Sequence, residues 1–475
     1  MFLINWGGMI SRWDPVYLSY LKQTKFTFKF PTQILRKVAS SFSGGTPSKE
    51  HLEYWNGNIP WASPKDVKEF YLSDTEDYIT EKGLCSSSSK LAAPGSVLLV
   101  VRSGILQHTI PVSVCSVPMA INQDIKVLTP NDDVLPAFLG YYFIVFNKML
   151  LPRIVKHSTT VQSINSFELG KLPIPIPSLS IQKEIIEILD TAYAQKKEKD
   201  HQSEELLENI NSYLLQSLNV DLVTDAEITL SDRIFCIRAK ELLGGRFDPR
   251  KYSQKYKQIM RAIDASIYPK KSLREIVLND VSGDWGLDDT VEDPDLISCL
   301  TIRGTEFDNK FNLNLDNNRT KFRKYKKASF NKIELNEKDI LIEKSGGSED
   351  QPVGRVAFIE KDMLDNYPLA FSNFIHRIRI DDKKAVPEYV FEYLRLMHNI
   401  KITEVMQTQT NGIRNLIMQE YFTQTILLPE PKKQEEIAIH AAQMRKRAFE
   451  LQMEAEKIVS DAKVKVKTML LEDEQ

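Results

Sequence analysis

The chain has 475 residues, 42% of them hydrophobic, and a formal net charge of −2 at pH 7. This length suits two or three domains rather than one core, and the charge disfavours a protein that coats nucleic acid through a uniformly basic surface. We expect no membrane span and no secretory signal, because no run of about 20 apolar residues and no basic leader occurs. The four cysteines form no CxxC pair, which predicts reduced thiols, no bound metal and a cytoplasmic location.

The first notable segment in chain order is Arg12–Tyr17, RWDPVY, and a second segment, Arg246–Tyr252, RFDPRKY, repeats part of it. Asp14-Pro15-Val16-Tyr17 is similar to the Asp-Pro-Pro-Tyr motif of amino-group methyltransferases, in which the aromatic side chain stacks on a flipped base. The second copy lacks both the second proline and the aromatic residue, and no Gly-rich cofactor turn is present. We therefore interpret both segments as domain entries, in which aspartate caps a helix and proline occupies its first turn.

Further matches between the two halves follow in order, with a slowly increasing separation, as insertions would produce. Val100-Val101-Arg102-Ser103-Gly104 matches Ile342-Glu343-Lys344-Ser345-Gly346, 242 residues later. The other matched sets are Pro31, Leu35 and Val38 with Pro269, Leu273 and Ile276; Pro136, Leu139 and Tyr142 with Pro387, Val390 and Tyr393; and Val161, Ile164, Ile174 and Gln182 with Ile413, Leu416, Ile426 and Gln434. The chain is therefore expected to contain one domain type twice.

Each half predicts the same succession of elements. Apolar runs predict strands at residues 96–101, 110–117 and 125–128, and in the second half at 339–342, 354–359 and 374–380. A short helix with proline in its first turn is expected at 136–146 and again at 387–397. A strand that runs into prolines follows at 172–177 and at 426–431. A long charged helix then closes each half.

These closing helices cover about residues 181–218 and 432–470, which contain no Pro or Gly. In the second, apolar residues recur at spacings of four and three, which is a heptad seam: Ile437, Ala441, Met444, Ala448, Leu451, Ala455, Ile458 and Ala462. We predict an α+β fold with a pseudo-two-fold internal repeat, in which two similar mixed α/β domains are joined by two long helices packed as an antiparallel coiled coil. The expected bounds are 1–177 and 221–430 for the domains, and 178–220 and 431–475 for the helices.

Residue patterns for catalysis are missing. The chain has no nucleotide-binding G-x-x-x-x-G-K-[ST], no H-E-x-x-H and no G-x-S-x-G, and its seven histidines do not cluster in sequence. Asp339 with Glu343-Lys344 only approximates a nuclease motif, and its counterpart in the first half has no carboxylate. The doubled fold is therefore expected to bind rather than to make or break bonds.

Three segments together resemble the specificity subunits of type I restriction-modification systems: Ser43–Val67, Thr159–Ile186 and Thr410–Ala438. The first is similar to the opening of their target recognition domains, and the other two pass from a recognition domain into a spacer helix. The family often has Glu-Gln where the helix begins, whereas this chain has Ile181-Gln182 and Lys433-Gln434.

The resemblance implies a subunit without a catalytic centre, in which each target recognition domain reads one half of a split double-stranded DNA sequence. The helices would fix the unread gap and dock two methyltransferase (modification) subunits. Translocating nuclease (restriction) subunits would join them. This chain would bind no cofactor itself, since S-adenosylmethionine, ATP and Mg are expected on the partner subunits.

Base reading needs forked donors, whereas phosphate contacts need cations, hydroxyls or backbone amides. The favoured candidates lie in loops that occur in both halves, after the matched strand and before the exit strand. They are Arg102, Ser103, Lys156, His157, Thr159, Thr160 and Gln162 in the first half, and Lys344, Ser345, Gln409, Thr410, Asn411 and Arg414 in the second. Further candidates outside these paired loops are Gly44, Gly45, Thr46, Lys49 and Lys65 in the first half, and Arg303, Arg319, Lys321 and Arg323 in the second.

Two other functions stay open. A coiled-coil scaffold whose end domains bind proteins would suit the near-neutral charge and the heptad seam. A DNA methyltransferase with a degenerate cofactor site would explain RWDPVY, and it predicts S-adenosylmethionine binding by the isolated chain.

Overall fold

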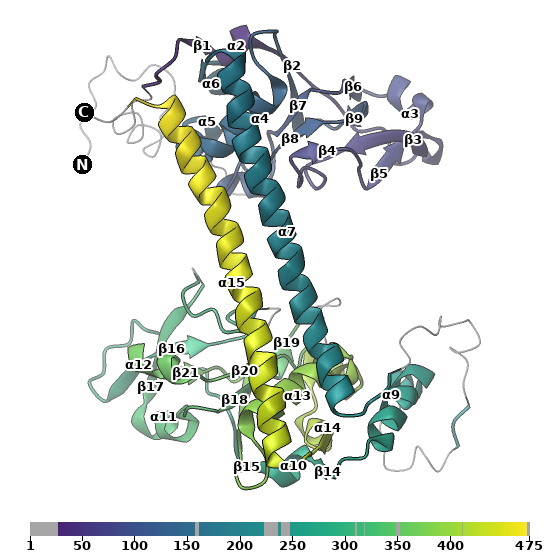
Figure 1. Ribbon diagram of the computed structural model, residues 1–475, viewed down its shortest axis with the longest axis vertical. Helices are drawn as coiled ribbons and strands as arrows, with labels where there is room; N and C mark the ends of the chain where they lie inside the picture. The colour runs from purple at the N-terminus through teal and green to yellow at the C-terminus, as the bar shows by residue number, and fades with distance from the viewer. Residues whose placement is uncertain are drawn as a thin grey trace. The chain divides into compact units, whose positions relative to one another are not determined.

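The computed structural model describes residues 27–156, 161–222, 236–238, 248–308, 311–317, 319–347, 352–410 and 412–472. The chain forms two compact units (Figure 1), which we call unit 1, residues 1–200 with 452–475, and unit 2, residues 201–451. Two long helices, α7 (Leu179–Ser217) and α15 (Pro431–Leu470), each contribute one half to either unit. Both helices were expected from the sequence, whereas the domain bounds proposed there stay a prediction.

Unit 1 contains two main sheets, with strand orders β2-β10-β7-β8-β4 and β5-β3-β9-β6. Their strands are β2 (Ala39–Ser43), β3 (Trp55–Ala62), β4 (Tyr71–Leu72), β5 (Asp77–Ile79), β6 (Lys90–Ala92), β7 (Val97–Val100), β8 (Val112–Cys115), β9 (Met119–Ile121) and β10 (Ile125–Pro130). Strands β7, β8 and β9 are buried along their whole length. A strand covered on both faces needs apolar residues at every position, which is why uninterrupted apolar runs predict these strands.

Two short pairs complete the sheets of unit 1, β1 (Thr32–Ile34) with β13 (Pro173–Pro175), and β11 (Val155–Lys156) with β12 (Ser163–Ile164). Its shorter helices are α2 (Leu35–Val38), α3 (Glu81–Cys85), α4 (Pro136–Val145), α5 (Asn147–Ile154) and α6 (Ser166–Gly170). Helix α4 is buried on most of its surface and packs into the same apolar core as the first turns of α7.

Unit 2 repeats this plan with sheets ordered β15-β22-β18-β20, β17-β16-β21, β19-β24-β23 and β14-β25. The strands are β14 (Lys270–Ser272), β15 (Val277–Ser282), β16 (Leu296–Ile302), β17 (Lys321–Lys326), β18 (Ile340–Glu343), β19 (Ser345–Gly346), β20 (Val356–Phe358), β21 (Leu369–Phe371), β22 (Ile375–Ile380), β23 (Gln407–Thr410), β24 (Ile413–Leu416) and β25 (Thr425–Leu427). The helices are α9 (Gln254–Ala265), α10 (Leu273–Ile276), α11 (Lys327–Ile333), α12 (Lys361–Asn366), α13 (Pro387–Asn399) and α14 (Met418–Tyr421).

The internal repeat extends to single hydrogen bonds. In unit 1 the hydroxyl of Tyr142 in α4 donates to the carbonyl oxygen of Pro173 at 2.8 Å. In unit 2 the hydroxyl of Tyr393 in α13 donates to the carbonyl oxygen of Thr425 at 3.0 Å. Each bond ties the short helix to the strand that leads into the long helix. The predicted duplication is thus confirmed within each unit, element by element.

The hydrogen bonds correct one of the matches drawn from the sequence. The amides of Ile164 and Leu416 donate to the carbonyl oxygens of Val101 and Lys344, at 2.8 and 2.7 Å. Lys344 is therefore equivalent to Val101, and Ser345 is equivalent to Arg102. The two segments are thus separated by 243 residues, not by the 242 that the sequence match indicates. Because side chains alternate along an extended segment, the cations Arg102 and Lys344 occupy different faces of their loops.

A buried glutamine joins each long helix to the domain before it. In α7, Gln182 accepts from the amide of Leu135 at 2.8 Å and donates to the carbonyl oxygens of Pro177 and Asp133. In α15, Gln434 accepts from the amide of Val386 at 2.9 Å and donates to the carbonyl oxygen of Pro429. Leu135 and Val386 precede the prolines of α4 and α13, so both glutamines satisfy backbone groups at a helix start.

Within each unit α7 and α15 pack against each other. The heptad residues Ile437, Ala441, Ala448, Leu451 and Ala455 are buried, as the spacing predicts. In unit 1, Lys196 and Lys199 of α7, which interrupt its apolar stripe, form ion pairs with Glu456 and Glu454 of α15. The partner numbers fall as the lysine numbers rise, so the two helices are antiparallel there. No helix in the described part of the chain is both long and apolar enough to span a bilayer.

The entry segment is described only in its second copy. Asp248 accepts from the amide of Arg250 at 3.0 Å, and Pro249 begins a 3₁₀ helix, Pro249–Tyr252. This confirms the expected role of aspartate as a cap and of proline as a first-turn residue. Arg12–Tyr17 and the residues Arg246 and Phe247 lie outside the described residues.

A buried histidine makes the stability of unit 2 depend on pH. Burial lowers the pKa of His398 to about 4, although its Nε2 lies 3.3 Å from the carbonyl oxygen of Pro352. Because the unfolded chain then binds more protons between pH 4 and 6.5, the free energy of unfolding should fall as the pH drops through that window and change little above it. Urea unfolding at several pH values should show a smaller drop for His398→Gln. His201→Gln changes an exposed histidine and should retain the wild-type dependence of stability on pH. If wild type, His398→Gln and His201→Gln all showed the same dependence, His398 would not be its cause.

Candidate functional site

In unit 1 the loop after β7 lies against the hairpin β11–β12. The amide of Ser103 donates to the carbonyl oxygen of Gln162 at 3.1 Å, and Arg102 forms a backbone bridge to Ser163. Lys156 is opposite Ser163 in the hairpin. Predicted site residues from two regions of the sequence are thereby brought together. The side chain of Arg102 is exposed and makes no hydrogen bond or ion pair within the described residues.

The equivalent place in unit 2 brings together the second predicted set. Ser345 and Arg414 belong to the small sheet β19-β24-β23, in which Arg414 faces both Gly346 and Gln409. The hydroxyl of Ser345 donates to the side-chain oxygen of Asn415 at 2.7 Å. Gln409 is exposed, whereas Arg414 is buried. His157, Thr159, Thr160 and Asn411 lie outside the described residues, as does the side chain of Thr410.

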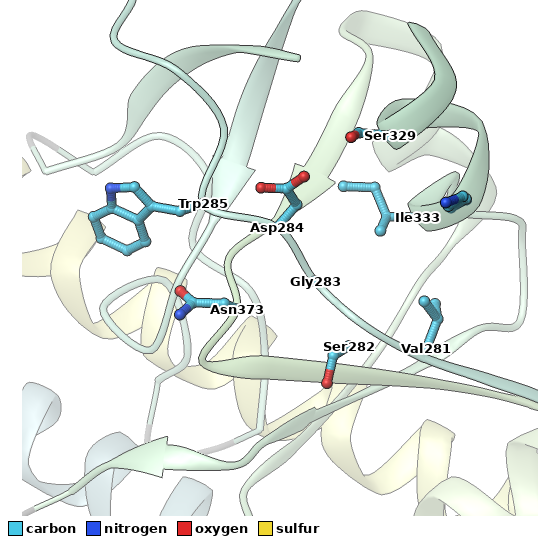
Figure 2. A pocket seen from close by; sticks show the side chains of 9 residues that line it. Val281, Ser282, Gly283, Asp284, Trp285, Ser329, Ile333 and Asn373 are labelled. Atoms are coloured by element: carbon cyan, nitrogen blue, oxygen red, sulfur yellow. The ribbon is translucent and has the colours of Figure 1, made fainter. Parts of the chain in front are cut away.

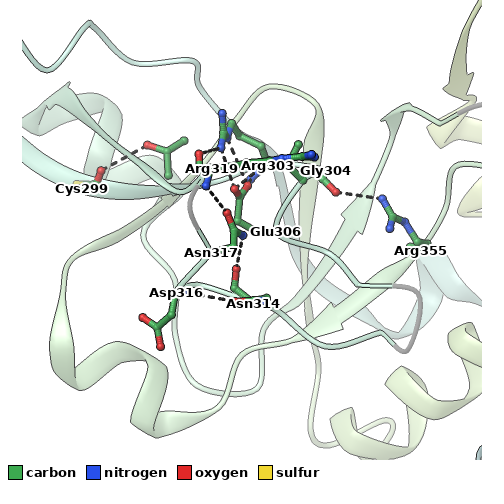
Figure 3. A network of polar contacts seen from close by, with 11 residues as sticks. Cys299, Arg303, Gly304, Glu306, Asn314, Asp316, Asn317, Arg319 and Arg355 are labelled. Atoms are coloured by element: carbon green, nitrogen blue, oxygen red, sulfur yellow. Dashed lines mark hydrogen bonds and ion pairs between the residues drawn. The ribbon is translucent and has the colours of Figure 1, made fainter. Parts of the chain in front are cut away.

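Three predicted cations besides Lys344 are engaged by the protein itself. Lys65 lies 2.9 Å from Glu76 and 2.9 Å from Asp77, which raises the pKa of its ammonium group. Arg303 donates to the buried carboxylate of Glu306, and Figure 3 shows this pair within a polar network that also holds the loop carrying Arg319. These internal partners occupy the N–H donors with which the cations would otherwise bind a base or a phosphate.

Arg323 is the third engaged cation. Its guanidinium donates to the carbonyl oxygens of Trp285 and Gly286 at 2.6 and 3.3 Å, and it lies 4.9 Å from the centre of the Trp285 ring. By contrast, Lys49, Arg319 and Lys321 are exposed, and none of their side chains has a hydrogen-bond or ion-pair partner in the described part of the chain. The exposed cations can therefore reach a ligand without breaking an internal pair.

Lys344 begins a chain of polar contacts across one edge of unit 2. Its ammonium group donates to the Ser282 hydroxyl at 2.7 Å, and that hydroxyl lies 3.2 Å from Nδ1 of His376. The other ring nitrogen of His376 lies 2.9 Å from Asp280, which also accepts from Arg274 at 2.6 Å. Burial lowers the pKa of both Lys344 and His376, and Asp280 opposes that effect at His376.

Gly44 and Gly45 are required by close packing. A Cβ atom on Gly44 would lie 2.0 Å from the carbonyl oxygen of Ile121, and one on Gly45 would lie 1.9 Å from the Ser88 hydroxyl. The amide of Gly45 donates to Ile121 and its carbonyl oxygen accepts from the Trp61 indole. These glycines bring the segment ending at Thr46 against β9, and the Thr46 hydroxyl donates to the side-chain oxygen of Gln123 at 2.7 Å.

Sequence reasoning missed the corresponding surface in unit 2. Trp285 and Phe374 are exposed aromatic residues whose ring centres are 5.9 Å apart. Trp285 and Asn373 also line a pocket of about 430 Å³ (Figure 2), between the segment after β15 and helix α11. The signal that could have found them is Gly283, which packs against the carbonyl oxygen of Phe371 as Gly44 does against that of Ile121.

Among the described residues no group of three or more His, Cys, Asp or Glu side chains could hold a metal ion. Cys115 and Cys299 are buried free thiols whose pKa values are raised by burial to about 11 and about 12. At neutral pH both are protonated, which makes them poor nucleophiles and poor metal ligands.

A family model described as the type I restriction modification DNA specificity domain matches residues 33–209 and 305–452. The curated relatives include the specificity subunit of the type I restriction enzyme EcoR124I/EcoR124II from Escherichia coli, 38% identical over 157 residues, or 33% of this chain and 39% of the relative. The specificity subunit of the type I restriction enzyme MjaIX from Methanocaldococcus jannaschii is 28% identical over 193 residues, or 39% of this chain and 43% of the relative. The chain thus spans less than half of the length of either relative.

A solved structure supports the fold over almost the whole chain. It comes from work on complex assembly and conformational transition of the type I restriction-modification system. It has a TM-score of 0.50 at 11% identity and covers 94% of this chain and 97% of its own. The family model covers well over half of this chain, in two segments that each run into a long helix. The chain therefore belongs to the type I restriction-modification DNA specificity domain family, and it carries the domain twice.

Proposed function

We propose that this chain is the DNA-specificity subunit of a type I restriction-modification complex, in which each unit reads one half of a bipartite duplex target. The observation that carries the proposal is the double match to the specificity-domain family. Two equivalent domains with different surface side chains are what two different half-sites require. The chain itself would catalyse no bond-making or bond-breaking step.

The distribution of charge supports this function. The net charge is near neutral and some predicted cations, such as Lys65, are paired internally, which suits selective contact rather than coating of DNA. Exposed Arg102 and Lys156 in unit 1, and exposed Arg319 and Lys321 in unit 2, supply the donors for phosphates and base edges.

The long helices support a second role, which is to hold partner subunits and to set the gap between the half-sites. Helix α15 exposes large apolar side chains outside its buried seam, Ile439 and Phe449 in unit 2 and Met453 and Val464 in unit 1. Exposed apolar side chains on a helix favour a protein partner. We propose that these partners are two methyltransferase subunits, joined by restriction subunits, and that S-adenosylmethionine, ATP and Mg bind to the partners.

The experiment that tests this function is co-expression of the chain with a candidate modification subunit, followed by mapping of methylated adenines in the host DNA. The expected result is one bipartite sequence with an adenine methylated in each half. Methylation at unrelated sites, or none with a partner that copurifies, would contradict the proposal. Binding of S-adenosylmethionine by the isolated chain would instead favour a methyltransferase.

Exchange of residues 1–177 for the corresponding domain of another family member is expected to change only one half of the methylated sequence. The physical reason is that each unit has its own core and its own candidate loops. Methylation mapping with the hybrid chain measures the effect, and the parent chain supplies the control. A change in both halves would show that the two units do not read DNA independently.

Arg102→Ala is expected to weaken duplex binding and to reduce the slope of log K against log salt by about one unit, because one exposed cation is lost from the interface. Lys344→Ala is expected to weaken binding as well, because the Ser282 hydroxyl to which Lys344 donates is neutral and does not offset its charge. Lys65→Ala is the matched control, since Lys65 is paired with Glu76 and Asp77 and should leave the slope unchanged. Titrations at several salt concentrations measure all three, and an Arg102→Ala slope equal to that of wild type would remove this residue from the contact.

A further inference from the structure

The two units place different side chains at one equivalent position. Asp284 and Gly45 donate their amides to the carbonyl oxygens of Phe371 and Ile121, both at 3.1 Å. The next residues, Trp285 in unit 2 and Thr46 in unit 1, are therefore equivalent.

The facing loop has the same correspondence. The amides of Ser372 and Asn122 donate to the carbonyl oxygens of Ile302 and Ala62, at 2.9 and 3.0 Å. The residues that follow, Asn373 in unit 2 and Gln123 in unit 1, are thus equivalent too. Both carry an exposed side-chain amide.

We propose that these positions, Thr46 with Gln123 and Trp285 with Asn373, determine which base pair each unit reads. The inference rests on the proposed function and goes beyond it by naming the residues that select the sequence. An amide side chain can accept from N6–H through its oxygen and donate to N7 through its nitrogen on the major-groove edge of adenine, so each amide is expected to select an A·T pair.

The backbone around Trp285 is held firmly although its side chain is 44% exposed. Its carbonyl oxygen accepts from Arg323, the amide of Gly286 donates to the Asp284 carboxylate at 3.0 Å, and the amide of Leu287 donates to the carbonyl oxygen of Lys324 at 2.7 Å. A large side chain on a fixed backbone loses little conformational entropy when it binds a ligand.

The surroundings of this position fit a nucleic-acid base. Phe374 is 42% exposed beside Trp285, and its carbonyl oxygen accepts from the amides of Lys344 and Ser345 at 2.9 and 3.2 Å. The aromatic pair therefore adjoins the loop that carries the predicted hydroxyl and cation. Nucleic acids bind well to such a surface, because bases stack on aromatic faces and phosphates bind to the neighbouring cations.

The amide of Asn373 is available for such a contact. It has no hydrogen-bond partner within the described residues, and Asn373 is among the residues that line the pocket beside Trp285 (Figure 2). In unit 1 the amide of Gln123 is oriented by two neighbours, since its oxygen accepts from Thr46 and its nitrogen lies 3.3 Å from Asp124. The same place thus offers an amide with an aromatic neighbour in one unit and an amide with a hydroxyl neighbour in the other.

The test is selection of bound duplexes from a randomised pool by the full chain, purified together with its modification subunit. Asn373→Ala is expected to lose about 10-fold or more of the preference at one base pair of one half-site. Gln123→Ala should do the same at one base pair of the other half-site. Trp285→Ala should lower discrimination in the same half as Asn373→Ala.

The controls are Asn366→Ala, an exposed amide at the end of α12, and Gln443→Ala, an exposed amide on α15. Both should retain the wild-type sequence pattern, and the thermal unfolding of Asn373→Ala and of both controls should match wild type because these three side chains are exposed. Three results would overturn this inference without affecting the proposed function. They are a fall in affinity that is equal for all DNA sequences, an unchanged pattern of selected sequences, and a loss of preference in the same half-site for both Asn373→Ala and Gln123→Ala. A wild-type complex that enriches no sequence would overturn the proposed function and this inference with it.

Discussion

Arg355→Ala is expected to destabilise unit 2 by about 3–5 kcal/mol, because it leaves a carboxylate buried without its counter-charge. The guanidinium of Arg355 donates to both oxygens of Glu343 at 2.7 and 2.8 Å, and only 2% of Glu343 is exposed. It also donates to the carbonyl oxygens of Phe307 and Gly304 at 2.9 and 3.0 Å. The substitution should therefore also release the loop that carries Arg303.

Hydrogen exchange resolved by peptide measures this effect where it occurs, with peptides of unit 1 as an internal reference. Peptides from β18 and β20 should lose protection, whereas those from β7 and β8 should not. Arg319→Ala removes an exposed arginine of the same unit and should stay within about 0.5 kcal/mol of wild type. The double variant Glu343→Leu with Arg355→Met removes both charges and should recover much of the loss. A change below about 1 kcal/mol in Arg355→Ala would show that the pair contributes little.

Gln434→Ala is expected to lower the free energy of unfolding by about 2–4 kcal/mol, since it removes the hydrogen-bond partner of the partly buried Val386 amide and of the buried carbonyl oxygen of Pro429. Gln182→Ala should act in the same way on unit 1, where the glutamine makes three such bonds. In each variant the loss of exchange protection should begin at the start of α13 or α4.

The matched control is Gln443→Ala, which removes an exposed glutamine from the same helix as Gln434 and should cost little. Gln434→Glu tests the hydrogen bonding separately, because its carboxylate can accept from Val386 but cannot donate to Pro429. If Gln434→Ala and Gln443→Ala unfolded at the same urea concentration, the buried glutamine would not be an anchor.

Much of the fold could be predicted from the sequence, because it depends on local patterns. Buried strands such as β7 need apolar residues throughout, and the seam of α15 repeats with the helix period, so both are visible in one dimension. The register between the repeats could not be predicted as well. The similarity of Arg102-Ser103-Gly104 to Lys344-Ser345-Gly346 suggests that Arg102 aligns with Lys344. The backbone shows instead that Val101 aligns with Lys344, because their amides donate to the equivalent carbonyl oxygens of Asp124 and Phe374.

The candidate site was predictable only in part for a similar reason. The exposed cations Arg102 and Lys321 stand out in the sequence, but the sequence does not reveal that Lys65 is paired with Glu76 and Asp77 or that Arg303 is paired with Glu306. Trp285 lies in an acidic stretch that gives no sign of a binding surface. Its equivalence to Thr46 is seen only in the structure, where Gly44 and Gly283 make the same close contact with a carbonyl oxygen of the facing strand.

The one-residue shift between the repeats has a practical meaning for chimeric chains built by grafting one repeat onto the other. A splice after Val101 has to continue with Ser345, because Lys344 already occupies the place of Val101. A splice drawn from the sequence match would continue with Lys344 and duplicate one backbone position. Every side chain in the grafted loop would then turn to the opposite face, which would bury polar groups and expose the apolar ones. Chimeric chains should therefore be designed from the hydrogen-bond register of the two repeats rather than from the similarity of their sequences.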